Sequence, residues 1–128
     1  MEALYPNTTD AILRCAVAVH RELGPGLPEH SYQTSLGLEM SAAQLPHVDD
    51  RPIIVRYRGV VVGWHRPDFI VDEKVVVEIK AVSTFDPVHA KQVLTYLKIT
   101  GLRVALLLNF NVPLLKDGIR RFVGRSFA

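Results

Sequence analysis

Asp68, Glu78 and Lys80 are the residues of this chain whose types and spacing best suit chemistry. They lie in the segment PDFIVDEKVVVEIK, where Glu78 and Lys80 stand in a run of valines. Because side chains alternate along a β-strand, Glu78 and Lys80 leave the same face of the expected strand VVVEIK. Two carboxylates beside a lysine suit a divalent-metal phosphodiesterase, in which carboxylate oxygens hold a hard cation such as Mg²⁺ and the lysine orients water or stabilises developing charge. The alternative is a structural ion pair at the edge of a sheet.

Asp68 and Glu78 can share one ion only if both side chains leave the same face of the sheet. A two-residue turn at 72–73 would pair Asp68 with Val77 and would place Glu78 on the wrong face. We therefore predict an odd-length connection such as 72–74, or a bulge in the strand that carries Asp68. The two carboxylates should then lie within about 6 Å of each other, close enough for one ion to bridge them.

The composition is that of an ordinary globular protein. The 128 residues are 48% hydrophobic and 22% charged, with no apolar run long enough to span a membrane, and they predict one domain over 1–128. The start of the chain lacks a basic region followed by an apolar one, so we expect no secretion signal. The single cysteine, Cys15, lies among apolar residues and is expected to be a small buried hydrophobe rather than a nucleophile. Together these features favour a reducing cytoplasm.

Charge is distributed unevenly along the chain. Residues 1–50 carry two basic and seven acidic side chains, whereas residues 51–128 carry thirteen basic and six acidic ones. The later part of the chain is therefore the part that would attract a polyanion. A solvated charged face is the alternative, so the asymmetry supports a nucleic-acid partner only weakly.

The pattern of apolar residues predicts the element order α-α-β-β-β-α-β. Gly24 and Pro25 end a first helix that begins after 7–9, and Pro28 begins a second helix that runs to about Gln44. Strands are expected at 52–57, at 60–71 with a bend near Gly63 or Pro67, at 75–80 and at 103–110. A helix is expected at 87–100. A loop should follow at 111–118, and then either a short edge strand or a helical turn at 119–123.

Strand 75–80 is the most apolar and is therefore expected at the centre of the sheet. If helix 87–100 is a crossover, strand 103–110 runs parallel to it. The predicted fold is an α/β sandwich with a mixed central sheet of about four strands flanked by helices. On helix 87–100 we expect an apolar stripe of Ala90, Val93, Leu94 and Leu97, and a different face carrying His89, Gln92 and Tyr96.

Four short motifs follow one another along the chain. They are GLPEHSY, which fits GxxExxY, then PD, ExK and QxxxY, at Gly26–Tyr32, Pro67–Asp68, Glu78–Lys80 and Gln92–Tyr96. Together they resemble the GxxExxY protein family of the PD-(D/E)xK nuclease superfamily, and the Gln–Tyr helix resembles that of its RecB-type branch. NFNVP at 109–113 and KDGIRR at 116–121 are similar to the closing segment of that family, so the resemblance covers nearly the whole chain. It implies a restriction-endonuclease-like three-layer sandwich.

The resemblance also implies a site with Mg²⁺ or Mn²⁺ as cofactor. Asp68 and Glu78 would bind the ion, and the backbone carbonyl of Ile79 would be a further oxygen ligand. Glu29 would complete the acidic cluster, either as a ligand or through an intervening water. From the residues alone, Glu29 is equally well explained as an acid that the dipole of the second helix favours in its first turn.

Lys80 would be the catalytic lysine, and Gln92 would position Lys80 or the substrate. Tyr32, Tyr96 and His89 are possible substrate contacts; both tyrosines are expected to pack with their hydroxyl groups at the rim of the cleft. Other roles are open for several side chains. Gln92 and Tyr96 would form an ordinary polar flank, His20 and His89 would be capping or buried neutral histidines, and Trp64 would pack in the core rather than stack on a base.

Two functions of different classes follow. The first is a metal-dependent nuclease that hydrolyses phosphodiester bonds, in DNA rather than RNA, with activated water. The second is a non-catalytic nucleic-acid-binding or assembly subunit that keeps the nuclease fold. The intact set of acids, lysine and glutamine favours the nuclease. Nothing beyond the core supplies target recognition, so sequence-specific cutting would need a homodimer or a partner protein.

Overall fold

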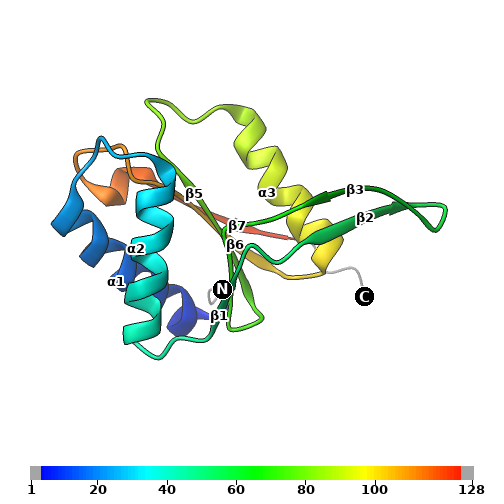
Figure 1. The fold of residues 1–128 in the computed structure, drawn as a ribbon, viewed down its shortest axis with the longest axis horizontal. Helices are drawn as coiled ribbons and strands as arrows, with labels where there is room; N and C mark the ends of the chain where they lie inside the picture. The colour runs from blue at the N-terminus through cyan, green and yellow to red at the C-terminus, as the bar shows by residue number, and fades with distance from the viewer. Residues whose placement is uncertain (1–3, 125–128) are drawn as a thin grey trace.

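The computed structural model describes residues 4–124. Figure 1 shows the helices arranged around a twisted sheet, with a long hairpin that extends to one side. The elements in chain order are α1 (Pro6–Leu23), α2 (Glu29–Ala42), β1 (His47–Asp49), β2 (Ile53–Tyr57), β3 (Val60–His65), β4 (Phe69–Val71), β5 (Val75–Lys80), α3 (Pro87–Thr100), β6 (Val104–Asn109), the 3₁₀ helix η1 (Leu115–Gly118) and β7 (Ile119–Val123).

The main sheet has five strands in the order β1-β4-β5-β6-β7. β5 and β6 pair in parallel, as the crossover helix α3 predicted, and the other neighbours pair antiparallel. β5 and β6 occupy the interior of the sheet, and every residue of both is buried except Lys80. This agrees with their near-continuous apolar sequences, which suit strands covered on both faces.

Helices cover both faces of this sheet and make the expected three-layer sandwich. Val75, Val77 and Ile79 of β5 lie in one core cluster with residues of α1 and α2. Val76, between them, lies in a second cluster with Val93, Tyr96 and Leu97 of α3. Because side chains alternate along β5, Glu78 and Lys80 leave the sheet on the α3 side, beyond Val76.

The predicted sheet differs from the observed one in its strands. The segment 60–71 does not form one strand but splits into β3 and β4 on either side of Pro67. β2 and β3 pair only with each other, in a two-stranded sheet of their own. The edge of the main sheet is instead β1, a strand of three residues that the sequence did not predict, and β7 forms the other edge, which settles the choice left open at 119–123.

The helix boundaries also differ in detail from those predicted. α1 begins at Pro6, after Tyr5 in a left-handed conformation with φ of 53°, so the polar residues at 7–9 lie inside the helix and do not cap it. Pro28 is the residue before α2 rather than its first residue. Both differences have the same cause, because proline is compatible with the start of a helix at more than one position.

On α3 the predicted cap at Asp86 and the predicted stop at Gly101 are confirmed. The Asp86 side chain accepts a hydrogen bond from the backbone N–H of Val88 at 2.9 Å, and Gly101 ends the helix with φ of 76°. The buried face was predicted less well. Leu94 is exposed and Tyr96 takes its place in the core, because the helix packs against both the sheet and the base of the β2–β3 hairpin.

Candidate active site

The connection between β4 and β5 decides where the two acids point. Phe69 pairs with Val77, and Val71 pairs with Val75, so three residues, 72–74, connect the strands. This is the odd-length connection predicted from the sequence. Extending the register by one step places Asp68 opposite Glu78, and directly opposed residues of an antiparallel pair share a face.

Asp68 and Glu78 are tied together by two reciprocal hydrogen bonds. The backbone N–H of Asp68 donates to Glu78 Oε1 at 2.8 Å, and the backbone N–H of Ile79 donates to Asp68 Oδ2 at 2.7 Å. Within the described residues, the other oxygen of each carboxylate makes no hydrogen bond. Each acid therefore uses one oxygen to hold the end of the strand pair and keeps the second for another partner.

Burial makes both carboxylates hard to ionise. It raises the pKa of Glu78 from 4.5 to about 8, with the charge of Asp68 acting in the same direction. Burial also raises the pKa of Asp68 from 3.8 to about 6, although the N–H of Ile79 stabilises the charged form. The nearest cation is Lys80, whose Nζ lies 4.0 Å from Glu78 Oε2. One lysine at this distance lowers the pKa of both acids but does not offset their burial.

Tyr96 of α3 also lies near Asp68 and Glu78. Burial raises the pKa of Tyr96 to about 12, and the charges of Glu78 and Asp68 act in the same direction. His65, Lys80, His89, Gln92 and Tyr96 line one pocket of about 490 Å³ together with Val88, Lys91 and Thr95. The structure thus places Lys80, Gln92, Tyr96 and His89 beside one another, on the side of the sheet that carries the two acids.

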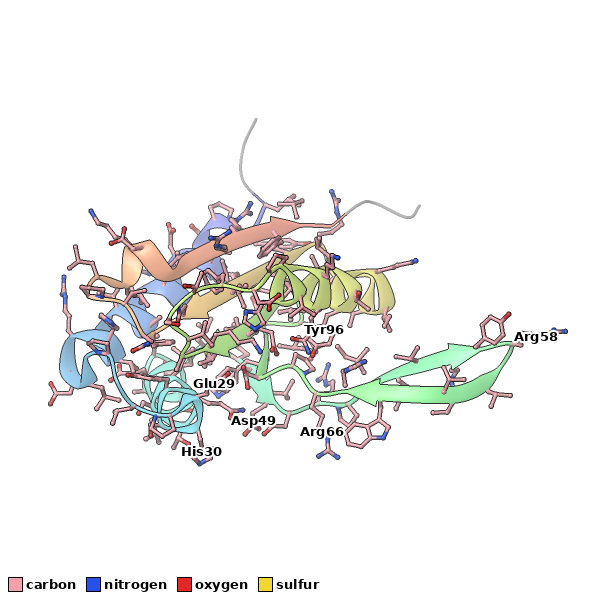
Figure 2. All side chains as sticks on the ribbon, turned by 90° about the horizontal axis from the view of Figure 1, so that it is seen from above. Glu29, His30, Asp49, Arg58, Arg66 and Tyr96 are labelled. Atoms are coloured by element: carbon pink, nitrogen blue, oxygen red, sulfur yellow. The ribbon has the colours of Figure 1, made fainter. Side chains whose placement is uncertain are left out.

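Glu29 does not complete a three-carboxylate cluster. Among residues 4–124, no three His, Cys, Asp or Glu side chains lie close enough together to hold a metal ion. Glu29 is the exposed first residue of α2, which packs on the face opposite α3, and Figure 2 shows Glu29 and Tyr96 in these separate layers. Its charge still raises the pKa of Asp68 and of Glu78, so it acts on the site at longer range.

Tyr32 lies in the core, away from the rim of the cleft where its hydroxyl was expected. Its side chain is fully buried and stacks on Phe110 with ring centroids 4.6 Å apart. Its hydroxyl donates to the carbonyl of Gly24 at 2.6 Å and accepts from the N–H of Leu27 at 3.1 Å. Tyr32 is thus not placed to contact a substrate, and it holds the loop that leads into α2 and Glu29.

His20 has a structural role, whereas His89 has both a structural role and a place in the pocket. His20 is buried and its Nε2 lies 2.8 Å from the carbonyl of Val112, which joins α1 to the segment after β6. His89 accepts a hydrogen bond at Nδ1 from the N–H of Asp86 at 3.3 Å in the capping box of α3, and it also lines the pocket. The structural role expected for both is therefore present, and His89 shares the lining of the pocket with Lys80.

Three residues near the site were not singled out from the sequence. Asp50 donates its backbone N–H to the carbonyl of Asp68 at 3.3 Å, and its charge raises the pKa of Asp68. His65 stands in the pocket with its ring 5.8 Å from that of Tyr96. Asn109 is buried; its side chain accepts from Val82 N–H at 3.1 Å and donates to Val82 carbonyl at 2.8 Å, which holds the chain as it leaves Lys80. Only the NFNVP motif pointed toward Asn109.

The comparisons with known proteins agree with this geometry. A model of the PD-(D/E)XK nuclease superfamily matches residues 6–122, nearly the whole chain. No curated protein and no solved structure is significantly similar to it. The chain belongs to the PD-(D/E)XK nuclease superfamily, and its three-layer sandwich is consistent with the restriction-endonuclease-like fold. Nucleases of this superfamily act on nucleic acids and generally use divalent metal ions.

Two other expectations from the composition concern Cys15 and membrane-spanning helices. Cys15 is buried on α1, and burial raises the pKa of its thiol, so it behaves as a core residue rather than a nucleophile. Within 4–124, no helix is long and apolar enough to cross a membrane.

Tyr32→Phe tests the role of the buried hydroxyl. The substitution keeps the ring but leaves Gly24 and Leu27 without their hydrogen-bond partner, so it should lower the free energy of unfolding by about 1–3 kcal/mol. Tyr57→Phe is the matched control because Tyr57 is 69% exposed, and it should change stability by less than about 0.5 kcal/mol. Urea unfolding measures both; equal stabilities of the two variants would contradict the assignment.

The raised pKa of Glu78 predicts a pH dependence of stability in the metal-free protein. The folded chain holds a proton on Glu78 that the unfolded chain releases near pH 4.5, so the free energy of unfolding should fall as the pH rises from 4.5 to about 8. Glu78→Gln should flatten this slope, because glutamine keeps an oxygen for the N–H of Asp68 but does not titrate.

Glu73→Gln is the control for this slope. Arg51 lowers the pKa of Glu73, so above about pH 5.5 Glu73 is ionised in both the folded and the unfolded state, and its replacement should leave the slope in that range unchanged. Thermal or urea unfolding in EDTA at several pH values makes the comparison. A slope in Glu78→Gln as steep as in the parent protein would show that Glu78 is not the titrating group.

Proposed function

We propose that the protein is a metal-dependent nuclease that hydrolyses phosphodiester bonds, in DNA rather than RNA. The observation that carries the proposal is the pair of opposed acids, each with one oxygen held by the backbone and one oxygen left over, beside Lys80. This arrangement lowers the stability of the folded protein when the two acids are ionised, because the pKa values of Asp68 and Glu78 are raised. The two acids do not line the pocket of Lys80 and Gln92 themselves but leave the sheet on the same side, and buried groups with perturbed pKa values next to such a pocket are typical of catalytic sites.

The residues present fit a divalent cation. Two carboxylates and a backbone carbonyl are oxygen donors, which Mg²⁺ and Mn²⁺ prefer. Burial, together with the charges of neighbouring acids, raises the pKa of both carboxylates, and a bound cation would favour their ionised forms. Asp68, Glu78 and the carbonyl of Ile79 would hold the ion, which when bound would polarise the phosphate and the attacking water.

The protein's own side chains supply the rest of the chemistry. Lys80 Nζ donates hydrogen bonds only, so it would orient the attacking water by its oxygen or stabilise charge that develops on the phosphate. Gln92 lies in the same pocket and would orient Lys80 or the substrate through its amide. The apolar surroundings that raise both pKa values also strengthen the interaction of Lys80 with a charged transition state.

We further propose that the chain is a GxxExxY-type member of the superfamily. Tyr32 closes the loop that begins at Gly24, which gives the tyrosine of this motif a physical role. Glu29, the acid of the motif, acts on Asp68 and Glu78 through its charge and does not join them in a cluster. We also propose one domain over 1–128 and a cytoplasmic location, which the single buried thiol of Cys15 suits.

The alternative is a non-catalytic nucleic-acid-binding or assembly subunit that keeps the fold. One observation favours it: in the described part of the chain the third carboxylate does not join the other two. The two functions differ in what Lys80 does, and the substitutions below separate them.

Divalent cations should stabilise the fold by binding to Asp68 and Glu78. At a concentration 100 times the dissociation constant, a ligand of the folded state adds about 2.7 kcal/mol to the free energy of unfolding. Asp68→Asn removes a repelling charge and keeps an acceptor for Ile79 N–H, so the metal-free variant should be no less stable while its response to Mg²⁺ or Mn²⁺ disappears. Asp10→Asn, at an exposed acid of α1, should respond like the parent protein. A melting temperature of the parent that ignores millimolar Mg²⁺ and Mn²⁺ would count heavily against the site.

Lys80→Ala should separate catalysis from binding. Lysine is no ligand of a hard cation, so the variant should still be stabilised by metal, yet its cleavage should fall by about a hundredfold or more. Gln92→Ala should lower cleavage less, in the same direction. Lys98→Ala, at an exposed lysine in the last turn of α3, is the matched control and should cut like the parent protein. The assay uses labelled single-stranded, duplex and branched DNA, and an RNA of the same sequence.

Asp68→Ala supplies the inactive control that excludes a contaminating nuclease. Parental cleavage by Lys80→Ala, with no cleavage by Asp68→Ala, would refute the proposed role of the lysine. In a binding subunit, Lys80→Ala and Gln92→Ala would change only affinity, and Lys80→Ala would reduce the salt dependence of binding by about one phosphate contact.

A further inference from the structure

The β2–β3 hairpin is exposed to an unusual degree. Within residues 4–124, its base is anchored where Ile53 packs with Val93, Tyr96 and Leu97 of α3. From there it extends away from the sandwich, and Figure 2 shows Arg58 at its far end. Of the thirteen exposed large apolar side chains in residues 4–124, six lie on this short hairpin, namely Ile54, Tyr57, Val60, Val61, Val62 and Trp64. A concentration of this kind marks a surface that binds another molecule.

The charge of the hairpin indicates what that molecule is. Between Pro52 and Pro67 there are three arginines, Arg56, Arg58 and Arg66, and no acidic residue. All three are exposed, and within the described residues none forms an ion pair. The guanidinium of Arg66 lies 4.6 Å from the ring centroid of Trp64, which holds the charge at the base of the hairpin. Pairing with the same hairpin of a second copy would bring like charges together, whereas a polyanion would be attracted.

The shape of the hairpin selects among polyanions. Its two strands pair with each other at five opposed positions, with a register shift between Val55 and Arg56, and the turn closes at Arg58 and Gly59, which both have positive φ. The major groove of B-form DNA is about 12 Å wide and admits a two-stranded ribbon of this kind, with arginine suited to guanine and valine methyl groups suited to the methyl group of thymine. The major groove of an RNA duplex is deep and narrow and does not admit it.

The hairpin is also continuous with the active site. His65, the last residue of β3, lines the same pocket as Lys80 and Gln92, and Asp68 follows three residues later. A duplex held by the hairpin would therefore pass next to the pocket. Strands of five to six residues reach roughly 17–20 Å, so such a contact would extend well beyond the scissile phosphate.

We propose that the β2–β3 hairpin is a DNA-binding arm that enters the major groove of duplex DNA and holds one backbone against the pocket of Lys80. The arm deepens the nuclease function proposed above and rests on it for the position of the cut. Arg56, Arg58 and Arg66 contact phosphates or guanine edges, the valines contact the groove floor, and Trp64 lies where the duplex meets the sandwich.

The charge of the arm is tested by a matched pair of double variants. Arg56→Gln/Arg58→Gln and Arg14→Gln/Arg21→Gln each remove two exposed positive charges, the second pair from α1. Binding to a labelled DNA duplex of about 20 base pairs, two helical turns, is measured in EDTA over a range of salt concentrations. The hairpin variant should bind at least tenfold more weakly, and its salt slope should be smaller by about 0.9 for each of the two arginines that contacts a phosphate. The α1 variant should stay within about twofold of the parent. Equal losses in the two variants would overturn the arm.

Trp64 provides a readout that needs no substitution. It is the only tryptophan of the chain and is 57% exposed, so its fluorescence reports on the hairpin alone. Addition of duplex DNA should change this fluorescence and protect it from iodide, and a duplex RNA of the same sequence should do neither at equal concentration. DNA binding that leaves Trp64 fluorescence and iodide quenching unchanged would overturn the proposal, as would equal effects of RNA.

Two further measurements separate this proposal from its competitors. Sedimentation of the DNA-free protein should give the same mass for the parent and for Arg56→Gln/Arg58→Gln; a change of mass would make the hairpin a contact between copies of the chain and would overturn the DNA-binding role. Glu78→Gln should bind duplex DNA like the parent in EDTA while failing to cut. If the parent protein binds DNA through the hairpin but does not cut it, the nuclease function is refuted and the DNA-binding arm is supported. If the parent cuts DNA and Arg56→Gln/Arg58→Gln cuts equally well, the nuclease function is supported and the arm is refuted.

Discussion

The site depends on a single structural constraint, the mutual hold of two carboxylates at the open end of the β4–β5 pair. The N–H of Asp68 binds the Glu78 side chain, and the N–H of Ile79 binds the Asp68 side chain. Each acid therefore accepts a backbone hydrogen bond from the segment that carries the other acid. The three-residue connection at 72–74 makes this possible, because it places the two acids opposite each other. A connection one residue shorter or longer would send one acid to the α1–α2 face.

This hold has an electrostatic cost that links the fold to its function. Two acids fixed side by side among apolar residues resist ionisation, and one lysine at 4.0 Å offsets only part of the effect. Hydrogen bonds outside the pair fix the segments around it: Asn109 holds the chain beyond Lys80, Asp50 holds the backbone of Asp68, and the buried Tyr32 holds the loop before Glu29. A cation between the acids would turn this cost into binding energy.

The layers of the sandwich divide the motif residues by role. β5 and α3 bring Lys80, Gln92 and Tyr96 to one pocket, on the face that Glu78 also takes. Glu29 and Tyr32 belong to α2 on the opposite face, where Tyr32 packs and Glu29 contributes charge. The hairpin adds a surface outside the sandwich that reaches back to the pocket through His65. In the proposed nuclease, chemistry, support and substrate contact would thus come from three separate parts of one short chain.

Much of this was predictable from local sequence. Apolar runs predicted β5 and β6, Asp86 and Gly101 predicted the ends of α3, and the period of two predicted that Asp68 and Glu78 need an odd-length turn. These features depend on near neighbours in the chain, where propensity and alternation act. The separation of β2 and β3 from the main sheet and the exposure of Trp64 were not predictable, because an alternating strand looks the same whether its partner is the sheet or only a hairpin mate. Tyr32 packs as expected, but its hydroxyl lies in the core rather than at the rim of a cleft, because it binds Gly24 and Leu27. The amino-acid sequence determined which residues are candidates for chemistry. Tertiary packing alone decided which of them meet, because burial and distance across layers are set by contacts between segments far apart in the chain.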